Sequence, residues 1–279
     1  MPRPLPVAAL LALLAGLAAC AAPAPMPAPD LPPPPYPAET RARMLRLVLG
    51  EWQEWGGRVL DARTTPTSDD NEGPVAEQDR AAFSKVLAYW SAVGWEAEIA
   101  RNRRAFTLGT PTECTPGELS SGGRAGLWGC QPWSAAFLSF VLRATGVDAV
   151  DFPPSSAHWA YVDALLRASD RWGPRAPFRA HDAADHPPAP GDIVCADRSR
   201  AALPSLAARR AEAGRPRPMH CDIVVATGAG EVTAVGGNVA QAVTAVRHAT
   251  DAQGRLSRTH RPWFVVFENR MGRQADPAR

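Results

Sequence analysis

The chain has 279 residues, a formal net charge of +2 and 46% hydrophobic residues, enough for one substantial domain with a smaller companion. Its 30 basic and 28 acidic residues nearly balance, which argues against a nucleic-acid partner. The sequence contains no Gly-rich phosphate loop, Cys-x-x-Cys pair or His-x-x-x-His pair, and it therefore predicts no metal and no other cofactor.

The first 38 residues have the pattern of an export signal followed by a tether. Arg3 precedes an apolar run that ends at Leu17 and is too short to span a membrane, so residues 1–19 are predicted to be a signal peptide. Leu-Ala-Ala-Cys then resembles the bacterial lipobox, which implies that Cys20 is lipidated and anchors the protein in a membrane. Ala21 after it is similar to lipoproteins of the outer membrane that face the periplasm. The alternative is an ordinary signal peptide cleaved after Ala19. Residues 20–38, rich in Pro and Ala, are predicted to be an extended tether.

Residues 39–110 are predicted to form an N-terminal helical region. Apolar residues recur at helical spacing over 39–56 and 76–93, and a short third helix is expected at 96–104. The main domain is expected over 111–270, followed by a tail at 271–279.

A helix with a polar residue in its first turn is predicted from Pro132. Trp133, Phe137 and Val141 recur at helical spacing, and Gly146 ends the pattern. Ser134 then lies where backbone N–H groups have no partner in the helix, a frequent place for a nucleophile. The alternative is that Ser134 is only a small residue at a helix start.

The remaining elements alternate between helix and strand. A second helix is expected from Trp159, and His158 before it is either part of a site wall or a surface neighbour of the helix cap; we favour the surface position. Strands are predicted at 190–194, 220–225 and 232–238, with a helical excursion over 196–218.

The order of four motifs resembles a known family. Pro-Trp-Ser-Ala-Ala-Phe from Pro132, Pro-Gly-Asp from Pro190, a strand that starts at His220, and Gly-Gly-Asn from Gly236 resemble the CHAP branch of the papain-like cell-wall amidases and peptidases. The resemblance covers about residues 127–250, and the Trp-Ser-Ala-Ala-Phe version is also similar to an uncharacterised branch of bacterial lipoproteins. It implies an α+β, papain-like (CHAP-type) fold in which an N-terminal helix packs on an antiparallel sheet.

The resemblance also implies roles for individual residues. Ser134 stands where the family has a catalytic cysteine, with His220 as general base and Asn238 as the amide that orients its ring. Gly236 stands about where some relatives have a supporting glutamate. Asp222, two residues from His220 on the same strand face, is a candidate substitute, and Trp133 is a candidate aromatic wall. The alternatives are a strand-end histidine at 220, a turn residue at 238 and a core tryptophan at 133.

Four cysteines remain besides Cys20, and three pairings are open to them. The family's strand order makes Cys195 and Cys221 antiparallel neighbours and favours a disulfide between them. Cys114 and Cys130 bracket a Gly/Ser-rich loop, and a second disulfide there would remove Cys130 as a nucleophile. The alternative keeps Cys130 as the reactive thiolate.

The sequence therefore predicts an envelope lipoprotein that hydrolyses amide bonds of peptidoglycan or a related envelope polymer. One alternative is a catalytically inactive module that binds peptidoglycan or another envelope partner. Another is a structural lipoprotein whose N-terminal helices contact such a partner.

Overall fold

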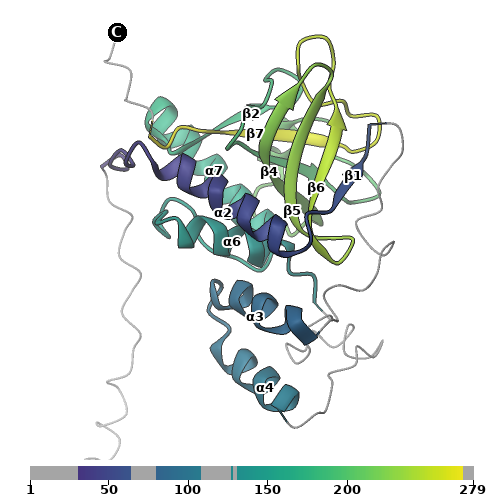
Figure 1. The fold of residues 1–279 in the computed structure, drawn as a ribbon. Helices are drawn as coiled ribbons and strands as arrows, with labels where there is room; N and C mark the ends of the chain where they lie inside the picture. Colours follow the sequence, from purple (N-terminus) through teal and green to yellow (C-terminus); the bar gives the residue numbers. More distant parts are fainter. Residues whose placement is uncertain (1–30, 64–79, 108–126, 128–130, 273–279) are drawn as a thin grey trace, which may run out of the picture. The chain divides into compact units, whose positions relative to one another are not determined.

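The computed structural model describes residues 31–63, 80–107, 127 and 131–272. From Pro32 onward the described residues form one compact unit. They contain a seven-stranded mixed sheet and six α-helices, so the predicted α+β class is confirmed (Figure 1). The lipobox, Cys114 and Cys130 lie outside the described residues. Within the described ranges, no helix is both long and apolar enough to cross a membrane.

The sheet has the strand order β1-β6-β5-β4-β3-β7-β2. All neighbours are antiparallel except β1 and β6, which are parallel. The strands are β1 (Val59–Asp61), β2 (Phe178–Asp182), β3 (Ile193–Asp197), β4 (Met219–Gly228), β5 (Glu231–Val239), β6 (Ala242–Ala249) and β7 (Trp263–Asn269). The strands predicted near 190–194, 220–225 and 232–238 correspond to β3, β4 and β5.

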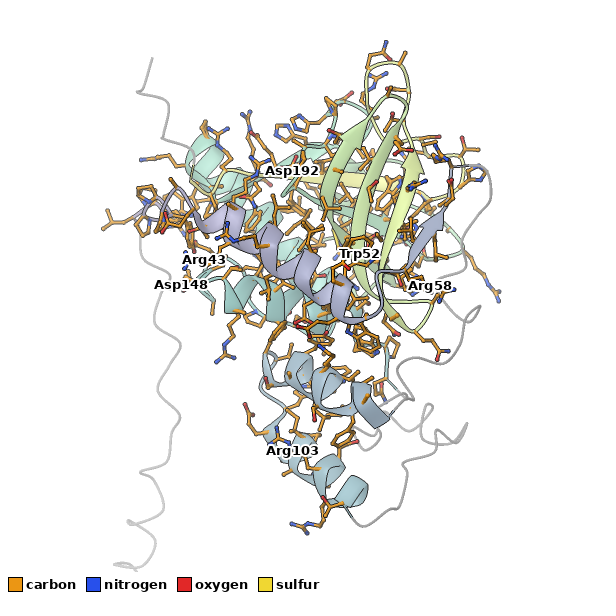
Figure 2. All side chains as sticks on the ribbon, in the orientation of Figure 1. Arg43, Trp52, Arg58, Arg103, Asp148 and Asp192 are labelled. Atoms are coloured by element: carbon orange, nitrogen blue, oxygen red, sulfur yellow. A yellow bond between two sulfur atoms is a disulfide. The ribbon has the colours of Figure 1, made fainter. Side chains whose placement is uncertain are left out.

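The expected antiparallel sheet is mixed because the N-terminal region adds a strand to it. β1 follows the first helix and lies beside β6 at one edge (Figure 1). The indole N–H of Trp52 donates to the carbonyl oxygen of Arg58 at 2.6 Å, which holds the turn between helix and strand (Figure 2). The sequence does not reveal this strand for two reasons. Three residues are too few for an alternating pattern, and the partner strand lies some 185 residues further along the chain.

The predicted helices of the N-terminal region are found with small shifts. The first is α2 (Thr40–Glu54), the second is α3 (Phe83–Ser91), which follows the short helix η3 (Arg80–Ala82), and the third is α4 (Glu96–Thr107). Residues 76–79 of the second prediction lie outside the described residues. Met44 and Val48 of α2 are fully buried, four residues apart on one face. The helices after them are α6 (Ser134–Ala144), α7 (His158–Trp172), η4 (Gly173–Arg175) and α8 (Leu206–Ala211), the last of which is the helical part of the predicted 196–218 excursion.

α6 occupies the centre of the structure and is apolar nearly all round. It packs against β4 and β5 on one side and against α2 and α3 on the other. Eight of its eleven residues are buried, beginning with Ser134. A helix enclosed in this way cannot reorient easily, and it therefore gives the residues of its first turn fixed positions.

The disulfide predicted between β3 and β4 is confirmed. Cys195 and Cys221 are direct partners in the antiparallel ladder, with Cα atoms 4.1 Å apart. The bond ties the strand that carries His220 to its neighbour.

Candidate functional site

Ser134 is the first residue of α6, after Trp133 at the helix cap. The backbone N–H groups of this first turn have no partner within the helix, and the helix dipole is positive there. Ser134 is 8% exposed as a residue, so it lies at the edge of the buried core.

The hydroxyl of Ser134 is hydrogen-bonded to a histidine. Its Oγ lies 2.7 Å from Nε2 of His158, the first residue of α7. His158 is 6% exposed, so the predicted surface position beside a helix cap is wrong. The packing of α7 against β2 and β4 carries this residue inward, a tertiary effect that a cap pattern does not reveal.

The second ring nitrogen of His158 is also paired. Nδ1 is hydrogen-bonded to the hydroxyl of Tyr161, which lies three residues later on the same face of α7 and is fully buried. Burial and the proximity of His220 hold the pKa of His158 well below 6.5, so this imidazole is neutral at physiological pH. Burial likewise raises the pKa of Tyr161 well above 10, and its hydroxyl keeps its proton.

A second imidazole and a carboxylate stand next to this pair. The ring centroid of His220 lies 5.3 Å from that of His158. Nε2 of His220 is 2.7 Å from Oδ1 of Asp222, and Arg261 donates to Oδ2 of the same carboxylate at 3.3 Å. Burial raises the pKa of Asp222, but His220 and Arg261 outweigh it and hold that pKa well below its usual range. Asp222 is therefore a buried anion with both oxygens engaged.

Two glycines of β5 make room for this arrangement. A Cβ on Gly236 would lie 1.9 Å from Oδ1 of Asp222 and 2.9 Å from Nε2 of His220. A Cβ on Gly237 would lie 2.5 Å from Cβ of Phe137 in α6. The first glycine admits the carboxylate, and the second lets α6 approach the strand.

The orienting hydrogen bond expected from Asn238 comes instead from Asp222. Asn238 is half-buried with φ at 56°, where the ladder between β5 and β6 shifts its register. Among the described residues, no hydrogen bond joins it to His220. Its left-handed backbone fits the alternative reading of a turn residue.

Trp133 is a core residue rather than an exposed wall. It is fully buried and stacks on Trp55 and Tyr89, with ring centroids 5.3 Å away in both cases. Its bulk packs the start of α6 against the N-terminal helices, so it fixes the backbone that carries Ser134.

The structure thus brings four polar side chains together from three elements: Ser134 from α6, His158 from α7, and His220 and Asp222 from β4. The predicted pair of Ser134 and His220 shares one site, but the hydroxyl bonds to His158 and forms no hydrogen bond to His220 in the described part of the chain. Sequence reasoning missed Tyr161 and Arg261 altogether. Tyr161 could have been found from its spacing, because a residue three positions after His158 lies on the same face of a helix. Among the described residues, no group of three or more His, Cys, Asp or Glu side chains is placed to hold a metal ion.

Fold and site together define an α+β protein with a serine, two imidazoles and a carboxylate gathered around the start of a central helix. Residues 77–269 match the family model DUF2272, described as an uncharacterized protein conserved in bacteria, and the chain belongs to this family. All four site residues lie within the matched range. No curated protein and no solved structure matches the chain.

Proposed function

We propose that this protein is a cell-envelope hydrolase that cleaves amide bonds of peptidoglycan or a related envelope polymer through Ser134. The observation that carries the proposal is the 2.7 Å contact from Ser134 Oγ to His158 Nε2, beside the His220–Asp222 pair. A serine hydroxyl is a weak nucleophile unless a base takes its proton during attack, and imidazole is the commonest base in proteins.

His220 is the better suited of the two imidazoles to take that proton. The carboxylate of Asp222 accepts from Nε2 of His220 and stabilises the imidazolium that forms. His158 has no carboxylate partner, and its depressed pKa disfavours a charged ring. With Nε2 of His220 donating to Asp222, the lone pair of the neutral ring lies on Nδ1.

The reaction then follows the acyl-transfer scheme. Nδ1 of His220 takes the hydroxyl proton while Oγ of Ser134 bonds to the carbonyl carbon and the carbonyl electron pair moves to oxygen. The intermediate collapses, the carbon–nitrogen bond breaks, and His220 returns the proton to the leaving amine. Water, deprotonated by His220, then cleaves the acyl ester and restores Ser134. The N–H groups of the first turn of α6, which have no partner within the helix, are donors for the oxyanion.

The substrate and the location rest on the sequence. The four ordered motifs support a papain-like arrangement of the CHAP type, and the lipobox supports lipidation at Cys20 and attachment to the outer membrane on its periplasmic side. A protein anchored there would face the peptidoglycan layer, whose peptide bridges contain amide bonds.

The test uses purified mature protein with peptidoglycan and mass analysis of released fragments. Wild type is expected to release fragments, Ser134→Ala to release none, and Ser134→Cys to retain activity because a thiol is the stronger nucleophile. Ser139→Ala is the control in the same helix: its buried hydroxyl bonds to the backbone of Ala135 and Ser155, at 2.9 and 3.1 Å, and not to the side chain of His158.

A fluorophosphonate probe adds a test that needs no substrate. Labelling of Ser134 in wild type and in Ser139→Ala, but not in Ser134→Ala, would support an activated hydroxyl. Absence of both labelling and released fragments would refute the proposal.

One observation favours a second candidate function. Ser134 is only 8% exposed, whereas an active nucleophile must be accessible to its substrate. Such burial is compatible with a site that no longer catalyses a reaction. The protein would then be an inactive module that binds peptidoglycan or another envelope partner. The inactive module would be identified if the protein sediments with insoluble peptidoglycan, releases no fragments from it, and does so equally as the Ser134→Ala variant.

A further inference from the structure

The buried pair of His158 and Tyr161 has a hydrogen-bond arrangement that decides what His158 can do. Tyr161 is fully buried, and its hydroxyl has one hydrogen-bond partner among the described residues, Nδ1 of His158. A buried hydroxyl proton without an acceptor is costly, so the phenol donates to this nitrogen. Nδ1 is then the acceptor nitrogen of the ring.

A neutral imidazole carries a single proton, and with Nδ1 accepting, that proton resides on Nε2. Nε2–H points at Oγ of Ser134, 2.7 Å away. We propose that Tyr161 fixes His158 as a permanent hydrogen-bond donor to Ser134 Oγ, so that His158 positions the nucleophile and never serves as its base. The catalytic consequence rests on the function proposed above; the tautomer itself does not.

The opposite arrangement is disfavoured on two counts. With the proton on Nδ1, His158 would donate to the phenolic oxygen and leave the tyrosine proton buried without an acceptor in the part of the chain that the structure describes. A doubly protonated ring is opposed by burial and by the neighbouring His220. The Nε2–H form gives the fully buried proton of Tyr161 an acceptor, and the hydroxyl proton that it leaves to another acceptor is that of Ser134, which is 8% exposed and within reach of water.

This arrangement divides the work between the two histidines. His158 donates to Oγ and holds it at the start of α6, which leaves the serine's own proton free for Nδ1 of His220. As the proton moves to His220 and negative charge builds on Oγ, the donated hydrogen bond strengthens. The proton on Nε2 of His158 stays in place throughout, so the proton balance of the reaction involves His220 alone.

Nitrogen-15 NMR of the histidine rings tests the tautomer without any substrate. The signals of His158 are assigned by their loss in His158→Gln. We expect a protonated, pyrrole-type Nε2 and a pyridine-type Nδ1 in wild type, unchanged between about pH 8 and pH 6 because the ring resists protonation. In Tyr161→Phe the Nδ1-protonated form should appear. A pyrrole-type Nδ1 in wild type would overturn the proposal and make His158 the base.

Kinetics on released fragments test the positioning role. Glutamine can donate a hydrogen bond but cannot act as a base, so His158→Gln should keep clearly more activity than His158→Leu. Tyr161→Phe should lower kcat by roughly tenfold with little change in KM, the pattern expected when a transition-state contact is loosened. Equal inactivity of the Gln and Leu variants, with both folded, would contradict donation by His158. If no variant and no wild type hydrolyses substrate, the NMR result still decides the tautomer.

Discussion

Two adjacent arginines in α8 form ion pairs that allow the contribution of a buried and an exposed pair to the free energy of unfolding to be compared. Arg209 donates from Nε and Nη2 to Asp163 of α7 at 2.8 and 2.7 Å, and the two side chains are 0% and 2% exposed. Arg210 makes the same two-pronged contact to Asp170, at 3.1 and 2.6 Å, but those side chains are 38% and 53% exposed. Arg209 also donates to Oε1 of Glu212 at 3.0 Å and to the carbonyl oxygen of Arg215 at 3.1 Å. The two pairs therefore differ in their contact with water and in these additional hydrogen bonds of Arg209.

Arg209→Met removes one charge while keeping most of the side-chain volume. The carboxylate of Asp163 then stays buried with the N–H of Gly214, at 2.7 Å, as its remaining donor. Breaking a buried pair from one side costs about 3–5 kcal/mol, because an uncompensated charge remains in the interior. Arg210→Met should cost below about 1 kcal/mol, since water already solvates both partners. For a protein of this size the first loss corresponds to a fall in Tm of roughly 10 °C.

Urea denaturation of both variants, followed by tryptophan fluorescence, provides the comparison. The double variant Asp163→Leu/Arg209→Met should recover much of the loss, because removing both charges spares their desolvation. Equal destabilisation by the two single methionine variants would refute the argument from burial. A double variant as unstable as the sum of its single changes would do the same.

Four further predictions follow from the disulfide, the site and the N-terminus. Replacing Cys195 and Cys221 by Ala should lower the free energy of unfolding in urea by about 3–4 kcal/mol for a sequence separation of 26, and no change would contradict the bond's role. The pKa of His158 is lowered in the folded state, so the unfolded chain binds a proton more readily and the free energy of unfolding should fall as the pH drops below about 6.5. Urea denaturation at pH 7.5 and 5.5 should show a smaller fall in His158→Gln than in wild type. Gly236→Ala would place a Cβ 1.9 Å from Oδ1 of Asp222, so it should displace this carboxylate and lower both kcat and thermal stability. A variant with unchanged kcat and stability would count against the packing argument. Cys20→Ala should move the protein from the membrane fraction to a soluble or unprocessed form, and an unchanged membrane fraction would exclude lipidation.

Local patterns were sufficient to predict much of this fold. The 3.6-residue recurrence of Met44 and Val48 marks α2, and Pro132 with the apolar residues after it marks α6. The disulfide could be predicted because Cys195 and Cys221 each lie on a strand whose neighbour the motif order implied. Such features depend on residues close in sequence or on one strand pairing.

The site residues that sequence analysis misplaced or missed are positioned by contacts between elements far apart in the chain. His158 stands beside serines that favour a helix cap, and only the packing of α7 turns it toward Ser134, 24 residues earlier. Arg261 reaches Asp222 across 39 residues from a segment without any periodic pattern. Neither contact leaves a signal within a window of the chain, because a single buried partner does not alter the local spacing of apolar residues.

The carboxylate of the site has room because position 236 is glycine. Some members of the family that the four motifs resemble have a supporting glutamate at about position 236, where this chain has glycine. The space is filled from the neighbouring strand, because Asp222 lies so close that even a Cβ on Gly236 would overlap its Oδ1. A buried carboxylate beside an imidazole is retained only when other groups offset its desolvation, and here Arg261 donates to the second oxygen. Asp222 and Arg261, in the space that Gly236 leaves, thus provide a buried anion that is hydrogen-bonded to Nε2 of His220.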